Sequence, residues 1–170
     1  IFAGIYWVLS NKLLDPKTCG AVLPILHLNG YKISGPTFFG RMTDEELLAL
    51  FTGYGYQPLI VQMTDQIYQD MSAALDTCYR QIQKIQQHAR QGKKYQRPVW
   101  PMVILKTPKG WTGVKQLSGE KVEGNFLSHQ VVLKDPKTDP EQLKILEDWL
   151  RSYEFKELFD PQHGFAKDIQ

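Results

Sequence analysis

Three short apolar segments, each bounded by glycine, proline or polar residues, restrict most strongly what this chain can fold into. They cover residues 21–28 (AVLPILHL), 57–62 (QPLIVQ) and 98–105 (PVWPMVIL). Nearly continuous apolar segments of this length are typical of strands that are buried on both faces of a parallel sheet. Pro24 cannot donate a backbone hydrogen bond, so we expect the first strand to begin near that residue.

Helical patterns separate these segments. Thr43 and Glu46 form a capping-box pattern that predicts a helix ending at Gly53, and apolar residues at spacings of three and four predict a long helix over about 65–88. Asp139 followed by Pro140 predicts the start of a last helix, with a stripe formed by Leu143, Leu146, Leu150 and Tyr153. Alternation of strand and helix predicts an α/β fold, a parallel sheet with helices on both faces.

Composition excludes several classes of function. The net charge is only +2 and the basic residues are scattered, so no nucleic-acid surface is indicated. Cys19 and Cys78 stand alone, which argues against a zinc site or a disulfide framework and fits a reducing cytoplasm. Ile1–Leu9 is apolar, but it lacks the basic residues of a signal peptide and is too short to span a membrane. We interpret it as an element cut open by truncation.

Polar residues follow the first apolar segment, where open parallel sheets bind their ligands. One interpretation of residues 26–33 (LHLNGYKI) is a β-hairpin that turns at Asn29-Gly30. The other is a magnesium site, in which Asn29 offers its amide oxygen, Tyr31 its backbone carbonyl, and Gly30 allows close approach. Spacing alone leaves the two interpretations about equally probable.

Two more candidate residues lie near and beyond the third segment. Lys109 follows it in a loop stiffened by Pro108, Gly110 and Gly113, where a lysine can neutralise a phosphate or donate a proton. Residues 111–133 have little periodicity and are long enough to form a functional loop, and they contain His129. A lysine in a turn is more often merely solvated, and a lone histidine is more often structural.

The order of these motifs resembles one family, the phosphoketolases. The resemblance extends from about Asn11 to Ile169 and is carried by residues 23–33 (LPILHLNGYKI), 35–37 (GPT), 44–47 (DEEL), 101–102 (PM), 107–112 (TPKGWT), 123–124 (EG) and 128–131 (SHQV). It implies a thiamine-diphosphate fold related to transketolase, with this chain as part of the diphosphate-binding (PP) domain. We expect that domain to cover residues 1–155 and an exit linker to begin at residue 156.

The resemblance also assigns roles. It implies that Asn29 and the Tyr31 carbonyl bind Mg²⁺, that Gly30, Ile33 and Lys109 contact thiamine diphosphate, and that Lys109 and His129 are catalytic. The implied enzyme is an aldehyde-lyase that cleaves xylulose 5-phosphate or fructose 6-phosphate with inorganic phosphate, giving acetyl phosphate, an aldose phosphate and water. We expect the full-length parent to be a homo-oligomer.

The sequence departs from the family pattern in several places. The Gly-Asp-Gly segment that supplies a carboxylate to Mg²⁺ does not occur in this chain, and neither do the upstream histidines or the pyrimidine-binding domain. Ile1–Leu9 does not match what we expect there, and Val114 and Val132 stand where prolines are expected. Because thiamine diphosphate binds between two domains, we expect this piece alone to be inactive.

Two alternatives remain open at this point. The same fold could transfer glycolaldehyde to an aldose, as transketolase does. The chain could also be a non-catalytic α/β module that binds a phosphorylated metabolite or a partner chain.

Overall fold

A computed structural model describes residues 11–92, 97–162, 164–167 and 169. The described residues form two compact units. One contains the residues up to Gly30 together with Thr37–Thr107, and the other contains Tyr31–Pro36 and the residues from Pro108 onward. The expectations for Ile1–Leu9 lie outside the described residues.

The first unit is built on a three-stranded parallel sheet. Its strands are β1 (Ile25–Leu28), β2 (Tyr56–Gln62) and β3 (Trp100–Lys106), in the order β1-β3-β2. The register sets Ile25 opposite Val103 and Tyr56 opposite Trp100. The parallel α/β prediction is therefore confirmed. β1 begins just after Pro24, whose carbonyl still accepts a hydrogen bond from the Val103 amide at 2.9 Å.

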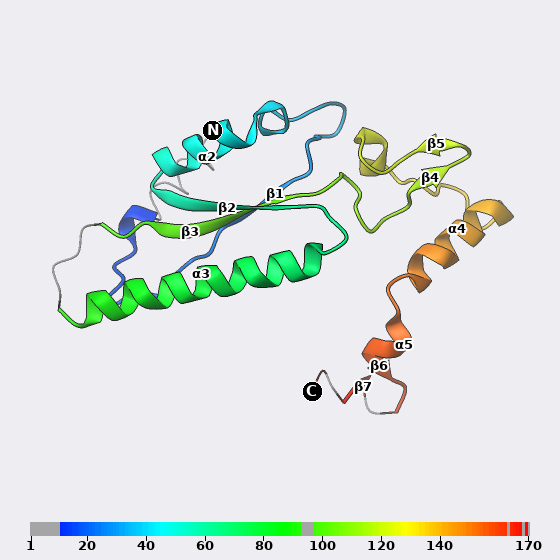
Figure 1. Ribbon diagram of the computed structural model, residues 1–170. Helices are drawn as coiled ribbons and strands as arrows, with labels where there is room; N and C mark the ends of the chain where they lie inside the picture. Colours follow the sequence, from blue (N-terminus) through cyan, green and yellow to red (C-terminus); the bar gives the residue numbers. More distant parts are fainter. Residues whose placement is uncertain (1–10, 93–96, 163, 168, 170) are drawn as a thin grey trace. The chain divides into compact units, whose positions relative to one another are not determined.

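Two helices cover the sheet of the first unit, α2 (Asp44–Gly53) and α3 (Ile67–Arg90), and Figure 1 shows one on each side of the strands. The predicted capping box is present at α2, because the Thr43 hydroxyl accepts from the Glu46 amide and the Glu46 carboxylate accepts from the Thr43 amide. A one-turn 3-10 helix, η1 (Phe39–Arg41), precedes α2.

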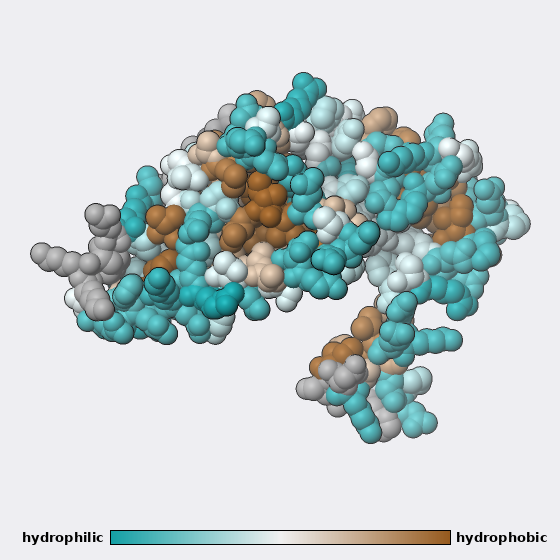
Figure 2. Space-filling view, in the orientation of Figure 1, coloured by the Kyte–Doolittle hydropathy of each residue, from teal (hydrophilic) through white to brown (hydrophobic). Residues whose placement is uncertain are grey.

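The centre of the core is β3, the middle strand. Val103 and Ile104 are fully buried, as are Leu47 of α2 and Cys78 of α3. Burial raises the pKa of the Cys78 thiol, so it stays neutral and serves as a small apolar side chain. In Figure 2, apolar side chains reach the surface over the strands, between α2 and α3. The described helices therefore do not cover this part of the sheet.

The second unit has little regular structure. Its elements are β4 (Gln116–Leu117), β5 (Glu120–Lys121), η2 (Phe126–His129), α4 (Pro140–Arg151), α5 (Phe155–Leu158), β6 (Phe159–Asp160) and β7 (Gly164–Phe165). β4 and β5 form a small antiparallel hairpin, as do β6 and β7.

Three details differ from the sequence-based expectations. β3 begins at Trp100 rather than at Pro98. The segment 111–133 is not a bare loop, because it contains the β4–β5 hairpin and η2. α4 begins where predicted, with the Asp139 carboxylate accepting from the amides of Glu141 and Gln142, but no residue of this helix is buried. The stripe of α4 was predicted from periodicity, which cannot say whether an apolar face finds a partner.

Candidate functional site

The turn after β1 is held in one backbone conformation. Gly30 has φ +79°, in the left-handed region that favours glycine, and its carbonyl accepts a hydrogen bond from the Thr37 amide at 2.9 Å. Gly40 lies directly against it, since a Cβ on Gly40 would come within 2.7 Å of the Gly30 Cα. Asn29, the proposed metal ligand, is therefore followed by a braced turn.

The hairpin interpretation of this segment is wrong. β1 pairs with β3 in parallel, while Tyr31 forms an isolated antiparallel bridge with Pro36 and the Lys32 amide donates to the Gly35 carbonyl at 2.8 Å. Asn-Gly is a strong hairpin signal only when no other strand competes for the ladder. Here β3 pairs with β1 instead, because that pairing buries the apolar side chains of β3 beside β1.

Lys109 is buried, unlike an ordinary turn lysine. Only 8% of the residue is exposed, and its Nζ donates to the Lys32 carbonyl at 2.8 Å and lies 3.5 Å from the Tyr31 carbonyl. Its own carbonyl accepts from the Gly124 amide at 2.7 Å. These contacts lie within the second unit. They bring together two predicted site residues that are 78 positions apart, Lys109 and Tyr31.

The loop that carries Lys109 packs against η2, which carries His129. A Cβ on Gly110 would lie 2.6 Å from the Ser128 Cβ. Asn125 caps η2 by accepting from the Leu127 amide at 2.7 Å, and the Ser128 hydroxyl donates to the Asn125 carbonyl at 2.8 Å. The neighbours of Lys109 and His129 are thus in contact, and the His129 side chain is exposed.

The six predicted site residues are divided between the two units. Asn29 and Gly30 belong to the first unit, whereas Tyr31, Ile33, Lys109 and His129 belong to the second. Ile33 is 62% exposed, on the short segment Tyr31–Pro36.

Sequence reasoning missed one polar pair at the carboxyl ends of the strands. His27 Nε2 lies 2.6 Å from the Thr107 hydroxyl oxygen, within the first unit. His27 lies within β1, and a histidine inside a strand is by itself no signal of a functional site. The register sets His27 opposite Leu105, and Thr107 follows Leu105 by two positions, so the two polar side chains meet diagonally at the ends of β1 and β3. Lys106 in turn donates to the Asp44 carboxylate at 2.5 Å.

The donor chemistry fits a magnesium diphosphate. An amide oxygen and a backbone carbonyl are hard oxygen ligands of the kind that Mg²⁺ takes, and a buried ammonium suits an anion. Two protein oxygens leave further ligand positions to phosphate, water or other groups. Across the described ranges, no group of three or more histidine, cysteine, aspartate or glutamate residues is arranged to bind a metal. None of the described helices is long and apolar enough to cross a membrane.

These features define a class of protein: an α/β domain with a parallel sheet and polar, glycine-stiffened loops after the strands. Comparison with known proteins identifies the family. The family model described as the XFP N-terminal domain matches residues 5–170, and the chain belongs to this phosphoketolase family.

Curated relatives agree. The chain is 52% identical over 163 residues to a probable phosphoketolase of Synechococcus elongatus, covering 95% of this chain and 20% of the relative. A probable phosphoketolase of Bradyrhizobium diazoefficiens is 51% identical over 164 residues, with the same coverage. One of Gloeobacter violaceus is 49% identical over 163 residues, covering 95% of this chain and 21% of the relative. The chain thus spans about a fifth of the length of these relatives.

Proposed function

We propose that this chain is part of an aldehyde-lyase, a phosphoketolase that uses thiamine diphosphate and Mg²⁺. The parent enzyme cleaves xylulose 5-phosphate, fructose 6-phosphate or both with inorganic phosphate, and it forms acetyl phosphate, an aldose phosphate and water. Membership of the family supports this proposal. We propose a cytoplasmic homo-oligomer as the form of the parent.

The observation that carries the site assignment is the buried ammonium of Lys109, held on the carbonyls of Lys32 and Tyr31. A buried cation is stabilised by oxygen acceptors and attracts an anion more strongly than a solvated one does. Asn29 and the Tyr31 carbonyl are the proposed magnesium ligands. Gly30, Ile33 and Lys109 are the proposed contacts to the cofactor.

Thiamine diphosphate, when bound, supplies the electron sink for carbon–carbon cleavage. The chain's own residues orient, neutralise charge and move protons. Lys109 Nζ has three hydrogens and donates to oxygen, so it suits stabilisation of a developing oxyanion. His129 is exposed on η2 and can donate a proton to a departing hydroxyl.

The decisive variant is Lys109→Met in the full-length parent. We expect kcat for acetyl phosphate formation to fall by about 10²–10⁴-fold, the usual range for loss of a general acid or base. Lys84→Met is the matched control, because Lys84 is an exposed lysine on α3. Undiminished turnover by Lys109→Met would remove Lys109 from the catalytic residues.

The same assay separates the reaction classes. Acetyl phosphate that forms only with inorganic phosphate supports a phosphoketolase, while products that need an added aldose and no phosphate indicate transketolase-like transfer. Calorimetry of the parent with Mg²⁺ and thiamine diphosphate tests the non-catalytic alternative. Absence of binding there would contradict our proposal.

The isolated chain is proposed to be inactive, since the remainder of the parent supplies the other face of the cofactor site. Acetyl phosphate formation by the purified chain, supplied with xylulose 5-phosphate, phosphate, Mg²⁺ and thiamine diphosphate, would contradict this part of the proposal.

A further inference from the structure

Thr112 has an unusual backbone conformation, three residues after Lys109. Its φ is +69°, in the left-handed region. For a β-branched residue this is a true outlier, because the branched Cβ approaches the following carbonyl. Such a conformation persists only where the surrounding structure holds it.

Two aromatic side chains hold this residue. Trp149 Nε1 donates to the Thr112 carbonyl at 2.9 Å, and the Tyr153 hydroxyl donates to the same carbonyl at 3.2 Å. The Tyr153 oxygen also lies 3.3 Å from the Thr112 hydroxyl and accepts from Trp149 Nε1 at 3.1 Å. Hydrogen bonds with Thr112, and secondarily with Trp149, lower the pKa of the Tyr153 phenol. We call Thr112, Trp149 and Tyr153 the clamp.

One side of the loop is not closely packed. A hollow of about 440 Å³ lies beside it, and its lining includes Trp111, Val114, Val131, Leu146, Trp149 and Tyr153. On that side the loop is restrained by the hydrogen bonds of the clamp.

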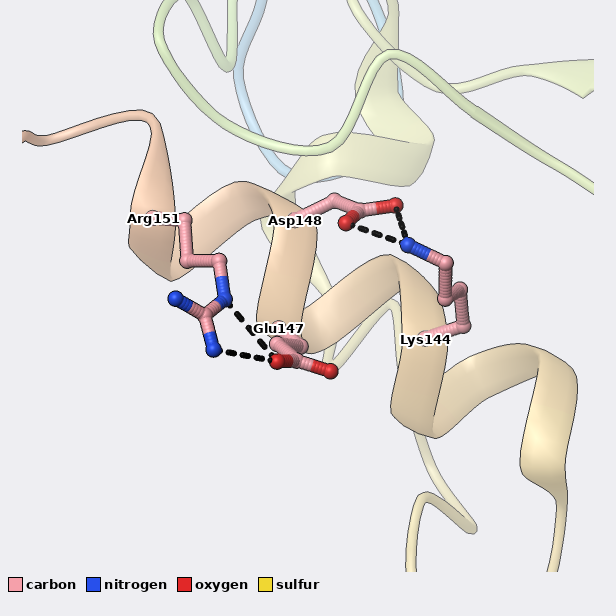
Figure 3. Close-up of polar contacts among 4 residues, drawn as sticks. All are labelled: Lys144, Glu147, Asp148 and Arg151. Carbon is pink, nitrogen blue, oxygen red and sulfur yellow. Dashed lines mark hydrogen bonds and ion pairs between the residues drawn. The ribbon is translucent and has the colours of Figure 1, made fainter.

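The helix that supplies the clamp is well defined. Ion pairs one turn apart, Lys144–Asp148 at 2.7 Å and Arg151–Glu147 at 2.6 Å, run along α4, and Figure 3 shows both. Trp149 belongs to α4, and Tyr153 follows its end by two residues. Exposed pairs of this kind add only a few tenths of a kcal/mol each, but they favour the helical conformation.

The restraint at Thr112 passes to Lys109 through a short closed loop. The Trp111 amide donates to the Pro108 carbonyl at 3.1 Å, and the Gly113 amide donates to the Gly110 carbonyl at 2.9 Å. On its other side, Gly110 lies against Ser128 with no room for a side chain. The loop Pro108–Gly113 is thus fixed by η2 at one point and by the clamp at another.

We propose that Trp149 and Tyr153 are positioning residues for the reaction. By holding Thr112 in its left-handed conformation, they hold Lys109 where it meets the anionic ligand. This inference rests on the proposed role of Lys109. It concerns residues that do not themselves touch the substrate or the cofactor.

The test uses the full-length parent and compares Trp149→Phe, Tyr153→Phe and the double variant with Tyr79→Phe. Tyr79 is an exposed tyrosine on α3 and serves as the matched control. We expect the double variant to lower kcat at least about tenfold, since a shift of about 1 Å in a catalytic group can cost about 10²-fold. Phenylalanine keeps most of each ring's volume, so the melting temperature should change little.

A rescue variant separates positioning from general loss of structure. Glycine adopts positive φ without strain, so Thr112→Gly should restore most of the lost kcat in the double-variant background. Failure of Thr112→Gly to restore kcat, or a kcat loss that follows a loss of melting temperature, would overturn the proposal.

Hydrogen exchange of the Trp111 and Gly113 amides gives a readout independent of activity. Faster exchange in the double variant together with lower kcat supports the proposal. Faster exchange with unchanged kcat shows that the clamp holds the loop without serving catalysis, which overturns it. Full activity of Lys109→Met in the same assay would instead refute the proposed role of Lys109, while the exchange data still report on the clamp.

Discussion

Individual glycines decide where the loops of the second unit can go, and Gly110 is the clearest case. It combines a left-handed backbone, φ +74°, with a contact that leaves no space for a Cβ. Gly119, in the β4–β5 turn, has a similar backbone, φ +82°, but nothing within 4 Å of the position of a Cβ. The pair separates the effect of conformation from the effect of crowding.

We therefore predict different costs for the two alanine variants. Gly119→Ala should lower the free energy of unfolding by about 1–2 kcal/mol, the penalty for a side chain in the left-handed region. Gly110→Ala should cost about 1–3 kcal/mol more, because the added methyl group overlaps Ser128. Denaturant unfolding followed by tryptophan fluorescence measures both values. Equal costs would show that Ser128 moves aside freely.

At the scale of elements, the helices begin where their side chains cap them. The Thr43 side chain and the Glu46 side chain satisfy each other's backbone amides at the start of α2. α2 then buries Leu47 against the sheet. A local signal and a tertiary contact therefore agree on the same helix.

Thr43→Ala should lower the free energy of unfolding by about 1 kcal/mol, the typical cost of losing a hydroxyl cap. Thr43→Ser is the matched control, since serine supplies the same hydroxyl oxygen. Chemical denaturation monitored by circular dichroism measures the difference. A Thr43→Ser variant as unstable as Thr43→Ala would show that the methyl group, and not the cap, is important.

The cap of α4 should make stability depend on pH. Hydrogen bonds from the Gln142 side chain and backbone, and from the Glu141 amide, hold the pKa of Asp139 below its ordinary value of 3.8. A carboxyl group whose pKa is lowered on folding stabilises the protein fully above its unfolded pKa, and this contribution is lost as the pH falls through the folded pKa. We expect α4 to weaken below about pH 4.

Asp139→Asn should remove this part of the acid sensitivity, because asparagine still caps but does not titrate. The measurement is the midpoint of urea unfolding between pH 7 and pH 3, for the unchanged protein and for the Asp139→Asn variant. An unchanged difference between them across that range would mean that Asp139 does not titrate differently on folding.

At the scale of the whole molecule, the sheet is small and its edges are open among the described strands. β1 and β2 are the outer strands, and Ile25 of β1 is 44% exposed. Further exposed apolar side chains lie in the second unit, including Leu143, Leu150, Phe155 and Phe165. Open edges and apolar patches favour association between chains.

We predict that the isolated chain self-associates as its concentration rises. Ile25→Lys should reduce this association, because a charged side chain on an outer strand opposes edge pairing. Sedimentation velocity at several concentrations, with Lys84→Met as a surface control, measures the effect. Identical association of Ile25→Lys and the unchanged chain would exclude the β1 edge.

The sequence predicted the layered part of the fold and failed where partners had to be known. Strands 25–28, 56–62 and 100–106, and the starts of α2 and α4, follow from apolar runs and caps that lie within a few residues of each other. The Asn29-Gly30 hairpin failed because β3 pairs with β1, and β3 lies some 75 residues further along the chain. The family resemblance, carried by several motifs in order, was confirmed by the family model. The roles of Asn29, Gly30, Tyr31, Ile33, Lys109 and His129, and the domain boundary at residue 155, stay predictions.

By itself the sequence determined the order of the three parallel strands and of α2, α3 and α4, the parallel class of the sheet and the family, because each depends on residue types and spacings that can be read along the chain. Only the tertiary structure decided that the Lys109 ammonium is buried on the Lys32 carbonyl, that Gly110 lies against Ser128, and that Trp149 and Tyr153 hold Thr112. The physical reason is range: a side chain finds distant hydrogen-bond partners only when the packing of other elements has brought them within about 3 Å.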